Sequence, residues 1–185
     1  MPEPQLFVVR LNAKLQPMHR GEIFEDPLDE ELKKSSLGSV SGGGTQMAKT
    51  GEIECCDIEI DVRAPSEESA VSIIRILERL GAPKGSKLIL ASDRETPFGS
   101  KEGLAVYLNG TDLPEAIYKE CDSNFVYSEF DRLLDGEGQV YSYWQGPRET
   151  AFYMYGNSFA TMSERLHPFL LSYPLCQRCR VVQIA

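Results

Sequence analysis

The sequence predicts an α+β protein made of two successive units, each with the order strand, helix, strand, strand, helix, strand. Three observations support this fold class. Residues 6–91 and 103–185 give the same order of elements, and Val106-Tyr107-Leu108-Asn109 echoes Val9-Arg10-Leu11-Asn12 near the start of each stretch. Between them lies a polar segment rich in glycine and proline, which is typical of a linker. We therefore expect one unit at residues 1–92, a linker at 93–102 and a second unit at 103–185.

The first unit begins with residues 6–12, where Phe7, Val9 and Leu11 alternate with polar or smaller neighbours as in a half-buried strand. Residues 26–34 predict a short helix, since Asp26 can cap it and Pro27 suits its first turn. A weak strand at 38–47 and a strong strand at 52–62 then form a hairpin. Ser66 begins an amphipathic helix that ends near Gly81, and residues 87–91 predict the last strand.

The second unit repeats this order. Residues 103–109 predict a strand, and Pro114 starts a helical stretch that breaks near residues 122–124 and resumes to Leu134. Residues 139–144 and 150–155 predict a hairpin. Asn157 or Ser158 caps a last helix that Pro168 should kink or end, and residues 178–185 predict the final strand.

The βαββαβ order of each half resembles the ferredoxin-like split βαβ unit, in which helices cover one face of a four-stranded antiparallel sheet. The resemblance rests on element order alone, so it implies a fold and no activity, because this architecture serves many functions.

The composition indicates a cellular location and a class of partner. The 42% hydrophobic content predicts a packed core, and no apolar run reaches the roughly 20 residues that span a bilayer. Five cysteines, an odd number with two adjacent, favour reduced thiols, so we expect a cytoplasmic protein that does not bind membranes. A net charge of −9 argues against nucleic acid as a partner and favours a basic protein.

No motif predicts catalysis, a cofactor or a metal. Gly42-Gly43-Gly44 lacks the following Lys-Ser/Thr pair of a phosphate loop, so a packing or bulge role is favoured. Cys176 and Cys179 have CxxC spacing, but no second such pair exists; coincidence is favoured, with a metal or redox role as the alternatives. The two histidines, His19 and His167, lie in no catalytic pattern.

Two sheet faces carry the candidate binding residues. The face that helices leave open in the first unit is expected to hold Asp57, Glu59 and Asp61, with Arg10 on a neighbouring strand; the simpler explanation is a solvated face with ion pairs. The corresponding face of the second unit is expected to hold five tyrosines. They are Tyr107, Tyr141, Tyr143, Tyr153 and Tyr155. Tyrosines are enriched at interfaces, which here means either a partner surface or a seam between the units.

Two functional hypotheses follow. The first is a non-catalytic, acidic protein-binding module, such as an intracellular inhibitor or immunity-type protein of a basic partner. The second is a small-molecule-binding regulatory or enzymatic domain, with a site between the two units to which Arg10 and His19 contribute. The sequence leaves the oligomeric state open, including assembly through an edge strand.

Overall fold

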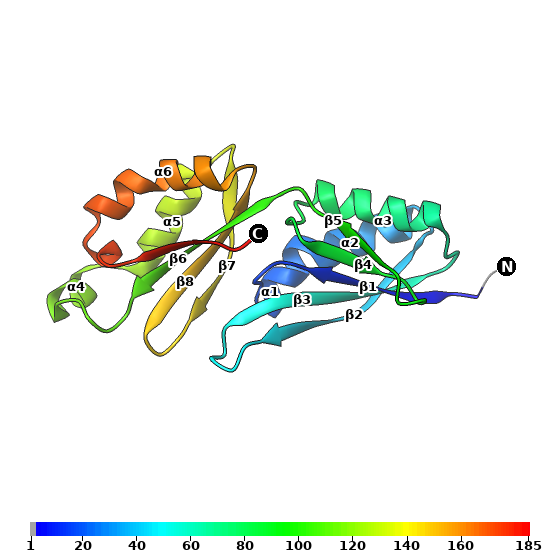
Figure 1. The fold of residues 1–185 in the computed structure, drawn as a ribbon, viewed down its shortest axis with the longest axis horizontal. Coiled ribbons are helices and arrows are strands. Elements are labelled where there is room, and N and C mark those ends of the chain that lie inside the picture. Colours follow the sequence, from blue (N-terminus) through cyan, green and yellow to red (C-terminus); the bar gives the residue numbers. More distant parts are fainter. Residues whose placement is uncertain (1–2) are drawn as a thin grey trace. The chain divides into compact units, whose positions relative to one another are not determined.

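The computed structural model describes residues 3–185 and shows an α+β protein with two antiparallel sheets, each with helices packed on it (Figure 1). The chain divides into two compact units. Unit 1 extends to Lys101, apart from Thr50–Glu52, and these three residues belong with Glu102–Ala185 to unit 2. Among the described residues, no helix is both long enough and apolar enough to cross a membrane.

Unit 1 has a five-stranded antiparallel sheet in the order β2-β3-β1-β4-β5. Its strands are β1 (Gln5–Leu11), β2 (Gly38–Met47), β3 (Ile53–Val62), β4 (Ser86–Ile89) and β5 (Glu95–Phe98). Its helices are α1 (Pro17–Arg20), the π-helix η1 (Gly21–Glu25), α2 (Asp26–Lys34) and α3 (Glu67–Arg79).

The core of unit 1 follows from the alternation of its strands. Val9 and Leu11 of β1 and Ile58 of β3 are fully buried, as are Leu28 of α2 and Leu77 of α3. Figure 1 shows α2 and α3 on one side of the sheet, so the other side carries the polar residues of the same strands.

Unit 2 has a four-stranded antiparallel sheet in the order β7-β8-β6-β9. Its strands are β6 (Glu102–Asn109), β7 (Gly138–Gln145), β8 (Glu149–Gly156) and β9 (Arg180–Gln183). Its helices are α4 (Glu115–Glu120), α5 (Ser123–Leu133), α6 (Phe159–Ser172) and the 3₁₀-helix η2 (Pro174–Cys176). Leu104, Val106, Phe152 and Met154 form the sheet side of its buried core, beneath α5 and α6.

Several element predictions hold and three features differ. The predicted helix 26–34 coincides with α2, and the predicted break at 122–124 separates α4 from α5. The predicted linker 93–102 instead contains β5, which pairs with β4 at the sheet edge; an edge strand tolerates Pro97. The segment before α2, expected to be a connection, forms α1 and η1. Pro168 does not end α6, which continues to Ser172.

The glycine run in β2 makes room for a buried arginine. Arg20 is 8% exposed, and its guanidinium donates to Glu25 Oε1 and to Thr45 Oγ1, both at 2.7 Å. A Cβ on Gly43 would lie 2.3 Å from Glu25 Oε1 and 2.9 Å from the carbonyl oxygen of Asp57. Gly43 therefore serves close packing, as the sequence favoured, because any side chain there would displace this pair.

Candidate functional site

The open face of unit 1 carries its acidic residues in a defined register. Arg10 lies opposite Asp57, Val8 opposite Glu59 and Leu6 opposite Asp61, on neighbouring strands β1 and β3. Because these positions alternate with buried core residues, their side chains all point to the face without helices. We call this surface the acidic face, and its members on β1, β3 and β4 are Leu6, Val8, Arg10, Asp57, Glu59, Asp61, Ile89 and Lys87, of which Lys87 is paired with Glu95 of β5.

One of the three predicted acids is already occupied. Arg10 holds Asp57 through two hydrogen bonds, from Nε to Oδ1 and from one terminal nitrogen to Oδ2, each 2.9 Å long. This hydrogen bonding and the charge of Asp57 raise the pKa of Arg10 above its ordinary value. The pair is solvent-exposed, so it contributes little to stability. It does neutralise this end of the acidic face.

The other end of the acidic face keeps its negative charge. Glu59 and Asp61 are exposed, and no ion pair joins either of them to a cation among residues 3–185. Beside them lie three aliphatic side chains: Leu6 is 45% exposed, and Val8 and Ile89 are partly exposed. Glu59 and Asp61, beside this aliphatic strip, are thus the acids of this surface that no ion pair within the described part of the chain neutralises.

Four of the predicted tyrosines form a buried cluster on the helix-free face of unit 2. Tyr107, Tyr141, Tyr153 and Tyr155 are at most 7% exposed. The hydroxyls of Tyr107 and Tyr153 both donate to Glu52 Oε1, at 2.6 and 2.9 Å. The rings of Tyr141 and Tyr155 are 5.0 Å apart. Tyr107 and Tyr153 are therefore held both by packing and by a shared hydrogen-bond acceptor.

The environment of the tyrosine cluster keeps its hydroxyls protonated. Burial, followed by hydrogen bonding to Glu52, raises the pKa of Tyr107 and of Tyr153 well above the ordinary tyrosine value. Burial alone raises the pKa of Tyr141 to about 12. The guanidinium of Arg180 lies 4.3 Å from the centre of the Tyr107 ring, a cation–π contact. None of these groups is poised to act as a base near neutral pH.

The sequence predicted Tyr143 on the same face as the other four tyrosines, and this prediction is wrong. A register shift between Val140 and Ser142 inserts one extra residue, Tyr141, into β7 opposite β8. After this bulge Tyr143 pairs with Phe152, a residue of the helix-side core, so Tyr143 lies on the helix side of the sheet. It is 38% exposed there.

Of the other residues that the sequence singled out, Arg10 and His19 belong to unit 1, and Cys176 and Cys179 belong to unit 2. Arg10 is engaged by Asp57, and His19 is partly buried on α1. Cys176 and Cys179 end a tight turn in which Cys179 N–H donates to Cys176 O at 3.1 Å. Burial, with Cys179 and Cys121 nearby, raises the pKa of Cys176 to about 12, which favours the protonated thiol at neutral pH. Among the described residues, no three His, Cys, Asp or Glu side chains are arranged to hold a metal ion.

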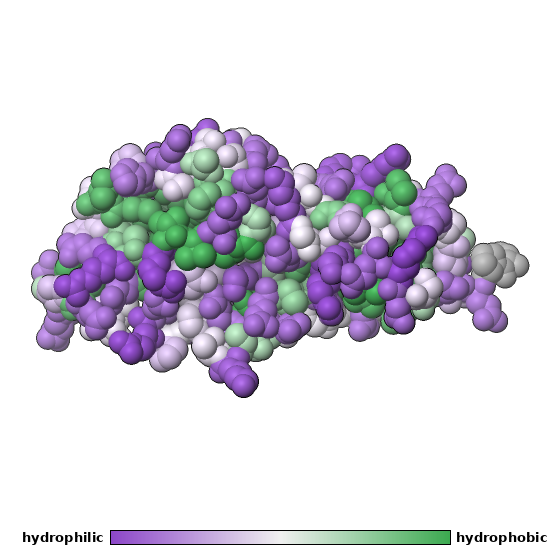
Figure 2. All heavy atoms as spheres, viewed as in Figure 1, coloured by the Kyte–Doolittle hydropathy of each residue, from purple (hydrophilic) through white to green (hydrophobic). Residues whose placement is uncertain are grey.

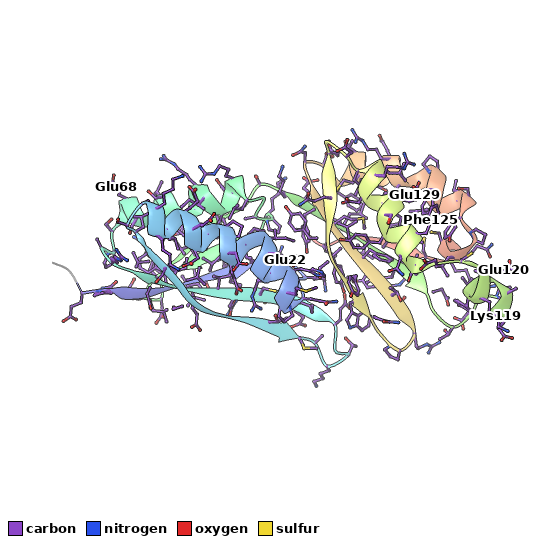
Figure 3. The ribbon with its side chains drawn as sticks, turned by 180° about the vertical axis from the view of Figure 1, so that it is seen from behind. Glu22, Glu68, Lys119, Glu120, Phe125 and Glu129 are labelled. Atoms are coloured by element: carbon purple, nitrogen blue, oxygen red, sulfur yellow. The ribbon has the colours of Figure 1, made fainter. Side chains whose placement is uncertain are left out.

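A cleft in unit 2 brings together residues that the sequence did not single out. One pocket of about 310 Å³ and another of about 220 Å³ share Ser123 and Thr150, so they are adjacent parts of one cleft. It lies where α5 begins, between α4 and the end of the β7–β8 hairpin; Figure 3 labels Lys119 and Glu120 on α4 and Phe125 and Glu129 on α5. The helix break at residues 122–124 was the signal in the sequence, since a break exposes the sheet beneath.

Comparisons with known proteins assign no family. No family model and no curated protein matches the chain. Among solved structures, the first two RRM domains of the yeast poly(U)-binding protein match at 9% identity and a TM-score of 0.27, over 97% of this chain and 99% of that one. A putative monooxygenase from Fusobacterium nucleatum matches at 7% and 0.33, over 99% and 92%. Another from Lactobacillus acidophilus matches at 13% and 0.31, over 100% and 95%. Similarities this low carry no argument about function.

Proposed function

We propose that this chain is a tandem pair of ferredoxin-like units and acts as a non-catalytic binding protein that receives a basic protein on the acidic face of unit 1. The fold part is supported by strand order. Numbered within each unit, the first four strands of unit 1 and the strands of unit 2 both follow the order 2-3-1-4, with all neighbours antiparallel. This is the arrangement of the split βαβ unit.

The pairing of charge with apolar area on the acidic face is the observation that carries the binding proposal. Glu59 and Asp61 remain uncompensated, whereas Asp57 is neutralised by Arg10. Leu6, Val8 and Ile89 supply aliphatic area directly beside these carboxylates. A basic partner would gain electrostatic steering from the two acids and hold its place through the aliphatic strip.

The charge of the whole chain supports the same class of partner. A net charge of −9 raises the local concentration of basic molecules and repels phosphate polymers. Five free cysteines are in keeping with a reducing compartment, and we infer a cytoplasmic location from them.

Charge reversal on the acidic face tests this function. Immobilised wild-type protein should retain a basic protein from an extract of the source cells, and the purified complex should weaken as salt is raised. The double variant Glu59→Lys/Asp61→Lys should lose at least about tenfold in affinity, mostly through slower association. Calorimetry on the purified pair measures both effects.

A matched variant distinguishes the effect of charge on the acidic face from the effect of the net charge of the chain. Glu120→Lys/Glu164→Lys makes the same change in net charge at exposed positions of unit 2 and should bind like wild type. Retention that is equal for both double variants, or the absence of any basic protein bound in a salt-dependent way, would contradict the proposal.

A further inference from the structure

The cleft of unit 2 is built on two rows of side chains across the sheet. In the first row, Thr150 of β8 lies between Leu108 of β6 and Gln145 of β7. In the second row, Phe152 lies between Val106 and Tyr143. Both rows lie on the side of the sheet that the helices cover. Because α5 begins only at Ser123, Thr150 and Gln145 of the first row stay at least partly exposed and line the cleft, whereas Leu108 is buried.

Four polar side chains of the cleft have no protein partner. The side chains of Ser123, Asn124, Gln145 and Thr150 line it, and none of them forms a hydrogen bond to any described residue. By contrast, Tyr118 donates to Asn109 O and accepts from Leu113 N–H, so its hydroxyl already serves the turn after β6. Two hydroxyls and two carboxamides therefore remain for a ligand, and each carboxamide offers a donor and an acceptor together.

The lining favours a neutral ligand over a charged one. Of the described residues that line the two pockets, none is charged. The N-terminus of α5, which would otherwise attract an anion, is capped by the Asp122 carboxylate, which accepts from Asn124 N–H at 2.8 Å. A phosphate would meet this negative charge, and an ammonium group would find no carboxylate in the lining. Burial of an uncompensated charge is costly, so a neutral compound fits best.

The aromatic residues of the cleft favour a flat molecule. Tyr143 is 38% exposed at the mouth, whereas the Phe152 ring is buried at the base with the Tyr127 ring edge-on to it, 6.1 Å away. The bulge in β7 is what turns Tyr143 toward this side. Exposed tyrosine rings are favourable stacking surfaces for planar rings.

We propose that this cleft binds a neutral heteroaromatic compound with a donor–acceptor edge, of the size and chemistry of a nucleoside. The ring stacks on Tyr143, and its edge pairs with the carboxamide of Gln145 or Asn124, as amide side chains do with nucleobases. Ser123 and Thr150 bind the hydroxyl groups of the attached sugar. This role is independent of the acidic face, which lies in unit 1.

Calorimetric titration with adenosine, adenosine monophosphate and glucose tests the proposal. Adenosine should bind saturably with a dissociation constant in the micromolar to low millimolar range, typical of a small ligand in a partly open site. The monophosphate should bind several times more weakly because of Asp122. Glucose should not bind.

Two variants locate the site. Tyr143→Ala should weaken adenosine binding by about tenfold or more through loss of stacking, and Gln145→Ala by roughly three- to tenfold. Gln139→Ala, an exposed glutamine on the same strand outside the cleft, should leave binding unchanged. Absence of saturable adenosine binding, tighter binding of the monophosphate or of glucose, or equal loss in the Gln139 variant would overturn the proposal.

Discussion

Gly43 is the residue at which the structure most clearly predicts that an added methyl group lowers stability. The Arg20–Glu25 pair lies against the bare backbone of β2 at this position, and the nearest atoms to an added Cβ include the backbone carbonyl of Asp57, which cannot rotate away. A backbone contact of this kind cannot be relieved by a change of rotamer.

We expect Gly43→Ala to lower the free energy of unfolding by about 1–3 kcal/mol, the usual range for overpacking. Gly44→Ala is the matched control, because no heavy atom lies within 4 Å of a Cβ built there. It should change stability by less than about 0.5 kcal/mol. Urea denaturation of the two variants and the wild type measures the difference, and equal stabilities would show that the space at Gly43 is not filled as described.

The helix α3 depends on an N-terminal capping box. Ser66 Oγ accepts from Ser69 N–H at 3.1 Å, and Ser69 Oγ accepts from Ser66 N–H at 2.9 Å. These bonds satisfy backbone donors that the helix itself leaves without partners. The amphipathic face that follows is buried through Ile73 and Leu77, so the start of the helix is coupled to the core of unit 1.

Ser66→Ala should therefore destabilise the protein by about 1 kcal/mol, the typical cost of losing a cap. Ser72→Ala is a suitable comparison, since Ser72 lies within the same helix and donates only to the Glu68 carbonyl. That change should be neutral or slightly stabilising, because alanine is the better helix former. Thermal unfolding by circular dichroism distinguishes the two; a Ser66 variant as stable as the Ser72 variant would contradict the capping argument.

Elements that depend on local periodicity could be predicted from the sequence, whereas features that depend on pairing could not. The helix from Ser66 follows from its cap and its apolar spacing, and the structure has it. The helix at 26–34 is also present, but the predicted Asp26 cap is wrong, because α2 continues directly from η1 and has no side-chain cap. The alternation Tyr141-Ser142-Tyr143 looks regular, yet a bulge is defined by the partner strand and leaves no local signal. β5 was hidden because an edge strand tolerates residues typical of a linker.

The candidate sites also differ in how far the sequence could predict them. The acidic face could be predicted because its residues alternate along single strands, but the Arg10–Asp57 pairing that occupies one acid depends on side-chain geometry. The cleft was missed because its lining comes from α5, the α4–α5 break and three strands. The helix break at residues 122–124 was the one local signal, and it does not reveal which strand residues complete the cleft.

At the scale of the whole molecule, the buried tyrosines limit the stability of the fold at alkaline pH. A tyrosine whose pKa is raised on folding binds its proton more tightly in the folded state. Its contribution to stability is therefore intact at pH values below the unfolded-state pKa, near 10, and is lost as the pH rises through the folded-state pKa. For Tyr141 this window extends from about pH 10 to about pH 12. The raised pKa values of Tyr107 and Tyr153 act in the same direction.

We expect the free energy of unfolding to fall steeply above pH 10. Tyr141→Phe should flatten this fall, by up to about 2 kcal/mol at pH 12, because phenylalanine has no proton to lose. Tyr143→Phe serves as the control, since it removes a hydroxyl from the same strand at a side chain that is 38% exposed and lies outside the buried tyrosine cluster. Denaturant titrations from pH 8 to pH 12 measure the slopes, and identical slopes for both variants would contradict the assignment to Tyr141.

Because β7 contains one extra residue, the face on which each of its side chains lies depends on the number of residues in the strand as well as on their identity. Deletion of Tyr141 would remove the phase change between the two halves of the strand. One half would then have to turn over: either Tyr143 leaves the cleft, or Val140 leaves the core. A homologue lacking this one codon would therefore have a different cleft without a single substitution, and sequence alignments across β7 should be judged by their gaps before their identities.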